Sequence, residues 1–138
     1  VPRTMRVLTG PDVVSTVFND VLAHLKRGET FYRYTSEKNL DEVNALLPKG
    51  YRERRDAKRL ERLVISNTES GSRKRARLER FIKFLGSSQE PFDQNHIVLI
   101  YGPRIAFIDL TRHEGLILEN AALAKFHRTI FRALYKRL

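Results

Sequence analysis

The segment at residues 96–110, HIVLIYGPRIAFIDL, decides the fold. Its first six residues are almost wholly apolar, which is typical of a central strand covered on both faces of a sheet. Gly102 can adopt the positive φ that a tight turn requires, and the residues after Pro103 return to a β-rich pattern. We therefore predict a β-hairpin whose two strands lie at 96–101 and 104–110.

The elements predicted on either side of this hairpin complete an α/β fold. Val13, Val17 and Val21 recur at helical spacing, so we predict a helix that starts near Pro11 and ends at Gly28. Strands at 5–9 and 30–36 flank it and make a strand–helix–strand unit, whose strands should be parallel. The remaining elements are helices at 40–47, 50–59 and 121–138 and strands at 60–66, 80–85 and 116–119. This order predicts a single mixed β-sheet flanked by helices.

The last predicted helix carries two stripes of side chains. At about 100° per residue, its apolar residues share one face and its basic residues gather on the opposite face. We expect the apolar stripe to pack on the sheet and the basic stripe to face solvent. The apolar stripe is Leu123, Phe126, Ile130, Phe131, Leu134 and Leu138, and the basic stripe is Lys125, Arg128, Arg132 and Lys136.

The composition narrows the classes of function. A chain of 138 residues has room for about one domain, and no apolar stretch approaches the roughly 20 residues of a membrane span. The chain has no Cys, which excludes disulfides, Cys-ligated metals and a cysteine nucleophile, and which agrees with a cytoplasmic location. The net charge of +10 favours a polyanionic partner, above all nucleic acid.

The start of the chain is left out of the predicted fold. Val1-Pro2-Arg3 resembles the end of a thrombin cleavage site that remains after protein expression. Residues 1–4 are therefore expected to be a tag remnant or linker, and one domain is predicted for residues 5–138. We expect no membrane partner.

Several segments, taken in order, resemble the effector domain of TrmB-type transcriptional regulators. The most specific is the C-terminal series, in which an apolar strand ends in Tyr-Gly and is followed by a short return strand, a strand ending in Glu and an aromatic helix. Tyr135 stands in this helix where the family commonly has Trp. The matching segments are MRVLTG at 5–10, YRERR at 51–55, RFIKFL at 80–85, HIVLIYG at 96–102, IAFI at 105–108, GLILE at 115–119 and the helix holding Ile130 and Phe131.

This resemblance implies a fold like one half of a phospholipase D-type enzyme, used as a sensor. In the family the domain follows a winged-helix domain that binds DNA, and no such pattern occurs in these residues. The resemblance thus implies a ligand-sensing and dimerisation domain, a homodimer, and contact with DNA through a domain absent from this chain. The implied effector is a small molecule, either a sugar or an anionic metabolite.

The motif for phospholipase D-type catalysis is missing. That chemistry needs His-x-Lys-x4-Asp, with the His as nucleophile, but His96 is followed by Val98 and Pro103 at the Lys and Asp positions. We find no metal-ligand spacing and no phosphate-binding glycine loop. We therefore expect no enzymatic activity, no metal and no cofactor; a degenerate phospholipase D-like phosphodiesterase is an alternative.

The expected effector contacts lie at strand ends, where α/β sheets place their ligands. Arginine outnumbers lysine in the basic region at 49–80, and its guanidinium offers paired donors to phosphate or carboxylate. That region also fits a solvated surface. The predicted ligand contacts are Tyr34, Ser36, Arg55, Arg80, His96 and Glu119.

A direct nucleic-acid-binding module is the alternative function, because the positive charge is concentrated in two places. The residues that would bind are Arg73, Lys74, Arg75 and Arg77 together with Lys125, Arg128, Arg132 and Lys136.

For the homodimer, like charges on the last helix would repel each other across a two-fold axis. We therefore expect the apolar surface of the hairpin strands, at 96–101 and 104–110, to form the interface.

Overall fold

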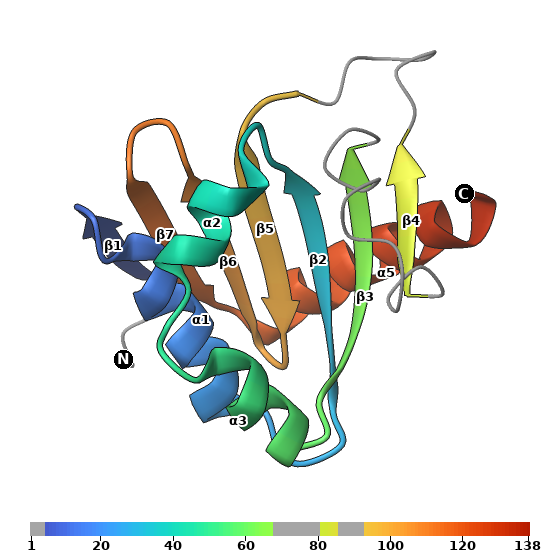
Figure 1. The fold of residues 1–138 in the computed structure, drawn as a ribbon. Coiled ribbons are helices and arrows are strands. Elements are labelled where there is room, and N and C mark those ends of the chain that lie inside the picture. Colours follow the sequence, from blue (N-terminus) through green and yellow to red (C-terminus); the bar gives the residue numbers. More distant parts are fainter. Residues whose placement is uncertain (1–4, 68–80, 86–92) are drawn as a thin grey trace.

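The computed structural model describes residues 5–67, 81–85 and 93–138. These residues form one mixed sheet in the order β1-β7-β6-β5-β2-β3-β4 (Figure 1). Helices α1 (Val13–His24), α2 (Leu40–Leu46) and α3 (Tyr51–Ala57) lie on one face, and α5 (Ala121–Arg137) crosses the other. The strands are β1 (Met5–Thr9), β2 (Thr30–Ser36), β3 (Glu61–Asn67), β4 (Ile82–Leu85), β5 (His96–Tyr101), β6 (Arg104–Asp109) and β7 (Glu114–Glu119). The predicted α/β class with a single mixed sheet flanked by helices is confirmed.

The sheet has a parallel part and an antiparallel part. Strands β2, β3 and β4 are parallel, whereas β5, β6, β7 and β1 continue from β2 with antiparallel pairing. The predicted hairpin is present, with Tyr101 paired to Arg104 and Gly102 at φ +57°. Strands β1 and β2 point the same way, as predicted for the strand–helix–strand unit, but three other strands lie between them.

The larger part of the core lies between the sheet and α1. Val17, Phe18 and Val21 of α1 are completely buried, because the apolar stripe of this helix lies against alternate residues of β5, β6 and β7. Helix α1 comes very close to the backbone of β7 at Gly115. A Cβ at that position would lie 2.6 Å from Cγ1 of Val13 and 3.2 Å from the carbonyl oxygen of Phe107. The absence of a side chain there lets α1 pack directly on β7.

The smaller part of the core lies under α5 and differs from the prediction. Phe131 and Ala124 are fully buried there, but Phe126 is 60% exposed and Ile130 is 45% exposed. On the basic stripe, Nη1 of Arg128 donates to the carbonyl of Gly102 at 3.3 Å, and Nη1 of Arg132 lies 3.5 Å from the hydroxyl of Tyr32. The expectation that the apolar stripe packs inward is therefore wrong for Phe126 and Ile130, and Arg128 is only partly exposed, whereas Arg132 is exposed as expected. The surface of α5 that packs on the sheet, which includes Ala124 and Phe131, lies between its apolar stripe and its basic stripe.

The hairpin strands use most of their apolar side chains within the chain itself. Ile97, Leu99, Ile100 and Ile105 are fully buried, and Val98 and Phe107 are only partly buried. The expectation that these strands form a dimer interface is therefore wrong for most of their surface. The exposed large apolar side chains lie elsewhere, at Met5 and Val7 of β1 and on the side of α5.

In the segments that the structure describes, no helix is both long enough and apolar enough to cross a lipid bilayer.

Candidate functional site

Three of the predicted ligand contacts lie on the α5 side of the sheet. The β2–β5 register pairs Ser36 with His96 and Tyr34 with Val98, so strand alternation puts Tyr34, Ser36 and His96 on one face. Tyr34 packs edge to face on Phe131 with the ring centroids 4.9 Å apart, and burial raises the pKa of its hydroxyl. Ser36 is buried and accepts a hydrogen bond from the backbone N–H of Gln94 at 2.8 Å. His96 is therefore the member of this group that solvent reaches most easily.

The structure does not bring the other predicted contacts to this place. Arg55 belongs to α3, on the opposite face of the sheet, where its guanidinium lies over the ring of Tyr51. Glu119 lies at the end of β7 and accepts a hydrogen bond of 2.7 Å from Nε of Arg104. Arg80 lies outside the described residues.

Glu119 belongs to a polar network under α1. Nη1 of Arg104 donates to both carboxylate oxygens of Asp20, at 3.0 and 2.9 Å, and the hydroxyl of Tyr101 donates to the same carboxylate at 2.7 Å. Burial and the hydrogen bond to Asp20 raise the pKa of Tyr101 far above its usual value. These contacts connect α1 to β5, β6 and β7. Glu119 therefore helps to hold the fold together through its ion pair with Arg104.

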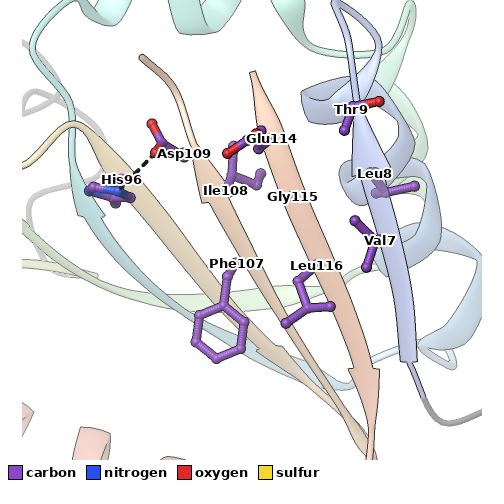
Figure 2. A pocket seen from close by; sticks show the side chains of 10 residues that line it. All are labelled: Val7, Leu8, Thr9, His96, Phe107, Ile108, Asp109, Glu114, Gly115 and Leu116. Atoms are coloured by element: carbon purple, nitrogen blue, oxygen red, sulfur yellow. Dashed lines mark ion pairs between the residues drawn. The ribbon is translucent and has the colours of Figure 1, made fainter. Parts of the chain in front are cut away.

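A hollow of about 400 Å³ lies next to His96 on the open part of the α5 side (Figure 2). We call it the His96 hollow. The antiparallel registers build it from two rows of side chains across β6, β7 and β1. The first row forms an apolar floor and the second a polar rim that His96 extends on β5. The floor is Phe107, Leu116 and Val7, and the rim is Asp109, Glu114 and Thr9.

The rim of the His96 hollow is acidic. Nε2 of His96 lies 3.6 Å from Oδ2 of Asp109. The backbone N–H of Arg112 donates to Asp109 at 3.0 Å and, as the main cause, lowers the pKa of that carboxyl; the charge of His96 and the N–H of Thr111 act in the same direction. Asp109 is thus held as a carboxylate, which only accepts hydrogen bonds.

This arrangement favours one kind of ligand over another. Carboxylates at Asp109 and Glu114 can accept hydrogen bonds from hydroxyl groups, while Phe107 and Leu116 can pack against an apolar ligand face. The same carboxylates repel an anion. The His96 hollow therefore suits a neutral polyhydroxylated molecule such as a sugar better than an anionic metabolite.

Sequence reasoning missed Asp109 and Glu114. Both stand at the polar ends of apolar strands, where such residues are common, so neither is conspicuous in the sequence. Only the β6–β7 register, which pairs Asp109 with Glu114, and the β5–β6 register, which pairs Asp109 with His96, bring the three together. The existence of the hairpin could have indicated the second of these pairs.

The residues predicted to bind nucleic acid are described only in part. Lys125 and Lys136 of α5 are exposed, and the guanidiniums of Arg128 and Arg132 contact the sheet as described above. The other four, Arg73, Lys74, Arg75 and Arg77, lie outside the described residues. Across residues 5–67, 81–85 and 93–138, no three His, Asp or Glu side chains are grouped closely enough to hold a metal ion.

Comparison with known proteins supports the fold. No family model matches the sequence, and no curated protein matches it either. Among solved structures, the chain is similar to TrmBL2, described as an archaeal chromatin protein with a novel mode of DNA binding. The TM-score is 0.64 at 9% sequence identity, over 96% of this chain and 50% of that one. The chain thus shares the fold of about half of TrmBL2.

Proposed function

We propose that this chain is the non-catalytic sensor domain of a TrmB-like transcriptional regulator, with a phospholipase D-like fold. The observation that carries the proposal is the fold similarity to TrmBL2, which extends over nearly the whole chain but only half of that protein. The order of the motifs in the sequence supports the same assignment independently. DNA would then be bound through a domain absent from this chain.

The proposed effector is a sugar or a related polyol bound in the His96 hollow. Asp109 and Glu114 would accept hydrogen bonds from its hydroxyls, His96 would add a donor or an acceptor, and Phe107 would pack on its apolar face. The hollow is built from β1, β5, β6 and β7. A ligand that contacts all four strands would therefore stabilise the conformation in which they keep the registers described above. An effector acts on an attached domain through such a difference in affinity between two conformations.

A homodimer is part of this proposal. Met5 of β1 and Phe126 and Ile130 of α5 are large apolar side chains between 45% and 60% exposed, and none of them lines the His96 hollow. Burying apolar side chains is what most strengthens association between protein chains. These residues, rather than those of the hairpin, are the proposed contacts between subunits.

The effector proposal is tested by a thermal-shift screen of neutral sugars and polyols. We expect at least one compound to raise the melting temperature, and Glu114→Gln with Asp109→Asn to abolish the effect. Glu53→Gln, an exposed substitution of the same kind on α3, is the control and should leave the effect unchanged. A screen in which no neutral sugar stabilises the chain, or stabilisation that persists in the double variant, contradicts the proposed site.

The absence of catalysis is tested with a chromogenic phosphodiester. The expected turnover is no higher than that of His96→Ala, since the Lys and Asp positions of the catalytic motif are held by Val98 and Pro103. Turnover that depends on His96 would favour a degenerate phosphodiesterase instead.

A second candidate function is direct contact with nucleic acid through the basic side of α5. It is favoured by the exposure of Lys125 and Lys136 and by the net charge of +10. Each phosphate contact should lower the affinity about 3-fold to 4-fold when salt rises from 50 to 200 mM. Lys125→Gln with Lys136→Gln should then reduce both the affinity for a DNA duplex and this salt dependence. Identical binding by the double variant would exclude α5 as the contact.

A further inference from the structure

Two arginines of the sheet face away from the His96 hollow. The parallel register pairs Arg33 of β2 with Val64 and Arg62 of β3 with Phe31. Phe31 and Val64 both face the side of the sheet that α1, α2 and α3 cover. Strand alternation therefore puts Arg33 and Arg62 on that side as well. Their position on adjacent strands, two residues apart along the register, makes them neighbours.

A third arginine reaches the same place from α3. The Cζ atom of Arg33 lies 5.3 Å from the ring centroid of Phe18, and the Cζ atom of Arg55 lies 5.7 Å from that of Tyr51. The two rings are themselves in edge-to-face contact, with centroids 5.2 Å apart. The aromatic pair thus connects the two guanidiniums. We call Arg33, Arg55 and Arg62 the arginine cluster.

The positive charge of the arginine cluster is only partly balanced. Glu37 is fully buried and accepts from Nη2 of Arg33 at 3.0 Å. Asp56 lies 3.4 Å from Nε of Arg55, but its side chain is 71% exposed, so water screens this pair. In the part of the chain that the structure describes, no carboxylate lies within ion-pair distance of Arg62, and the buried Nε of Arg33 has no hydrogen-bond partner.

Arg33 and Arg55 destabilise the charged form of Arg62. Burial, and then the charges of Arg55 and Arg33, lower the pKa of Arg62 to about 10. A guanidinium is among the hardest groups to deprotonate, so the shift reflects strong destabilisation of its charged form. A negative charge placed among the three side chains would offset the repulsion that Arg33 and Arg55 exert on Arg62.

The chemistry of the cluster specifies the ligand. Guanidiniums present paired N–H donors in a planar fork that matches the oxygens of phosphate or carboxylate. Arg55 and Arg62 are only partly buried, so a small ligand can reach them from solvent. We propose that Arg33, Arg55 and Arg62 bind a small oxyanion, either inorganic phosphate or an acidic group on a metabolite. This site is distinct from the His96 hollow and goes beyond the effector proposed there, which is neutral.

The test is thermal unfolding of the chain in sodium phosphate, in glycerol 3-phosphate and in succinate, each compared with sodium chloride of the same ionic strength. Binding at saturation should raise the melting temperature by about 3 °C or more. A rise with inorganic phosphate identifies a free anion as sufficient, a rise only with glycerol 3-phosphate identifies a phosphorylated metabolite, and a rise only with succinate identifies a carboxylate. If none of the three exceeds the chloride reference, the proposal is wrong.

Variants separate this site from a general effect of charge. Arg62→Gln removes one charge of the cluster, so it should raise the melting temperature in chloride and abolish the shift caused by the anion. Arg27→Gln removes the same charge from an exposed loop and should keep the shift. If Arg62→Gln does not fold, Arg55→Gln replaces it with the same expected result. A shift that survives the cluster variant, or that disappears equally in Arg27→Gln, overturns the proposal.

Discussion

Replacing Arg104 with Met tests how strongly the polar network under α1 connects that helix to the sheet. Met keeps much of the apolar length of the arginine side chain but removes three donated hydrogen bonds, two to Asp20 and one to Glu119. The change therefore removes the cation with little loss of packing. Asp20, which is about 9% exposed, is left with Tyr101 as its main donor from the sheet.

The expected loss in the free energy of unfolding follows from the burial of Arg104 and Asp20, the two partners of the ion pair. Removing one partner of a fully buried ion pair destabilises a protein by about 3–5 kcal/mol, because the remaining charge is uncompensated. The Arg104 side chain is 21% exposed, and Tyr101 still donates to the carboxylate, so water and the hydroxyl reduce this loss. We expect the free energy of unfolding to fall by about 2–3 kcal/mol.

Urea denaturation at neutral pH measures this change. With an m-value of about 1.5 kcal/mol/M, the midpoint should move down by about 1.3–2 M. Adding Asp20→Asn removes the uncompensated charge and should recover part of the loss. A loss below about 0.5 kcal/mol would refute the reasoning, since that is the range of an exposed surface ion pair.

Three further predictions concern a buried tyrosine, the contact between α1 and the sheet, and the exposed apolar side of α5. Burial raises the pKa of Tyr101, so the unfolded chain ionises first and stability falls as the pH rises above the usual tyrosine pKa of about 10; Tyr101→Phe should flatten this alkaline loss when unfolding is followed from pH 9 to 11. Gly115→Ala should destabilise by about 1–3 kcal/mol in urea, because the added Cβ collides with Val13, and a neutral result would mean that α1 can move away freely. Light scattering at several concentrations should show a homodimer, and Phe126→Glu with Ile130→Glu should give a mass near 16 kDa at the same concentrations; a dimer that survives both changes excludes α5 as the interface.

The sequence was sufficient for the elements whose pattern has a single interpretation. The apolar strand at 96–101 and its turn could be recognised because β-branched and aliphatic residues end abruptly at Gly102. The last helix could be recognised too, but not the face that it buries. Its apolar residues cover an arc wider than one sheet contact, and the small residue Ala124 is fully buried together with Phe131. Periodicity counts hydrophobic residues and does not measure side-chain size, so Phe126 and Ile130 were assigned to the core.

The candidate site was less accessible to sequence reasoning. Tyr34, Ser36 and His96 share a face because of the β2–β5 pairing, which joins residues distant in the sequence. The position of Arg33 within its strand is itself informative. Arg33 alternates in phase with Phe31 and Thr35, which are buried. The alternation therefore places a charged side chain on a buried face of the sheet. A charged residue in the buried phase of a strand indicates either a partner or a site.

The pairing of β1 with β7 has a consequence for how the chain folds. The first strand of the described fold hydrogen-bonds to the last, with Met5 opposite Leu118, whereas β5, β6 and β7 follow one another through short turns. Closing a loop is slower and entropically less favourable the more residues it contains, so the local hairpins should form early and β1 should join last. β1 and β4 are the two edge strands and each has one neighbour only, so β1 should be among the first strands to detach from the native state and to exchange its amide hydrogens. Because β1 forms one wall of the His96 hollow, the hollow would open and close with this local unfolding while the rest of the sheet stays intact.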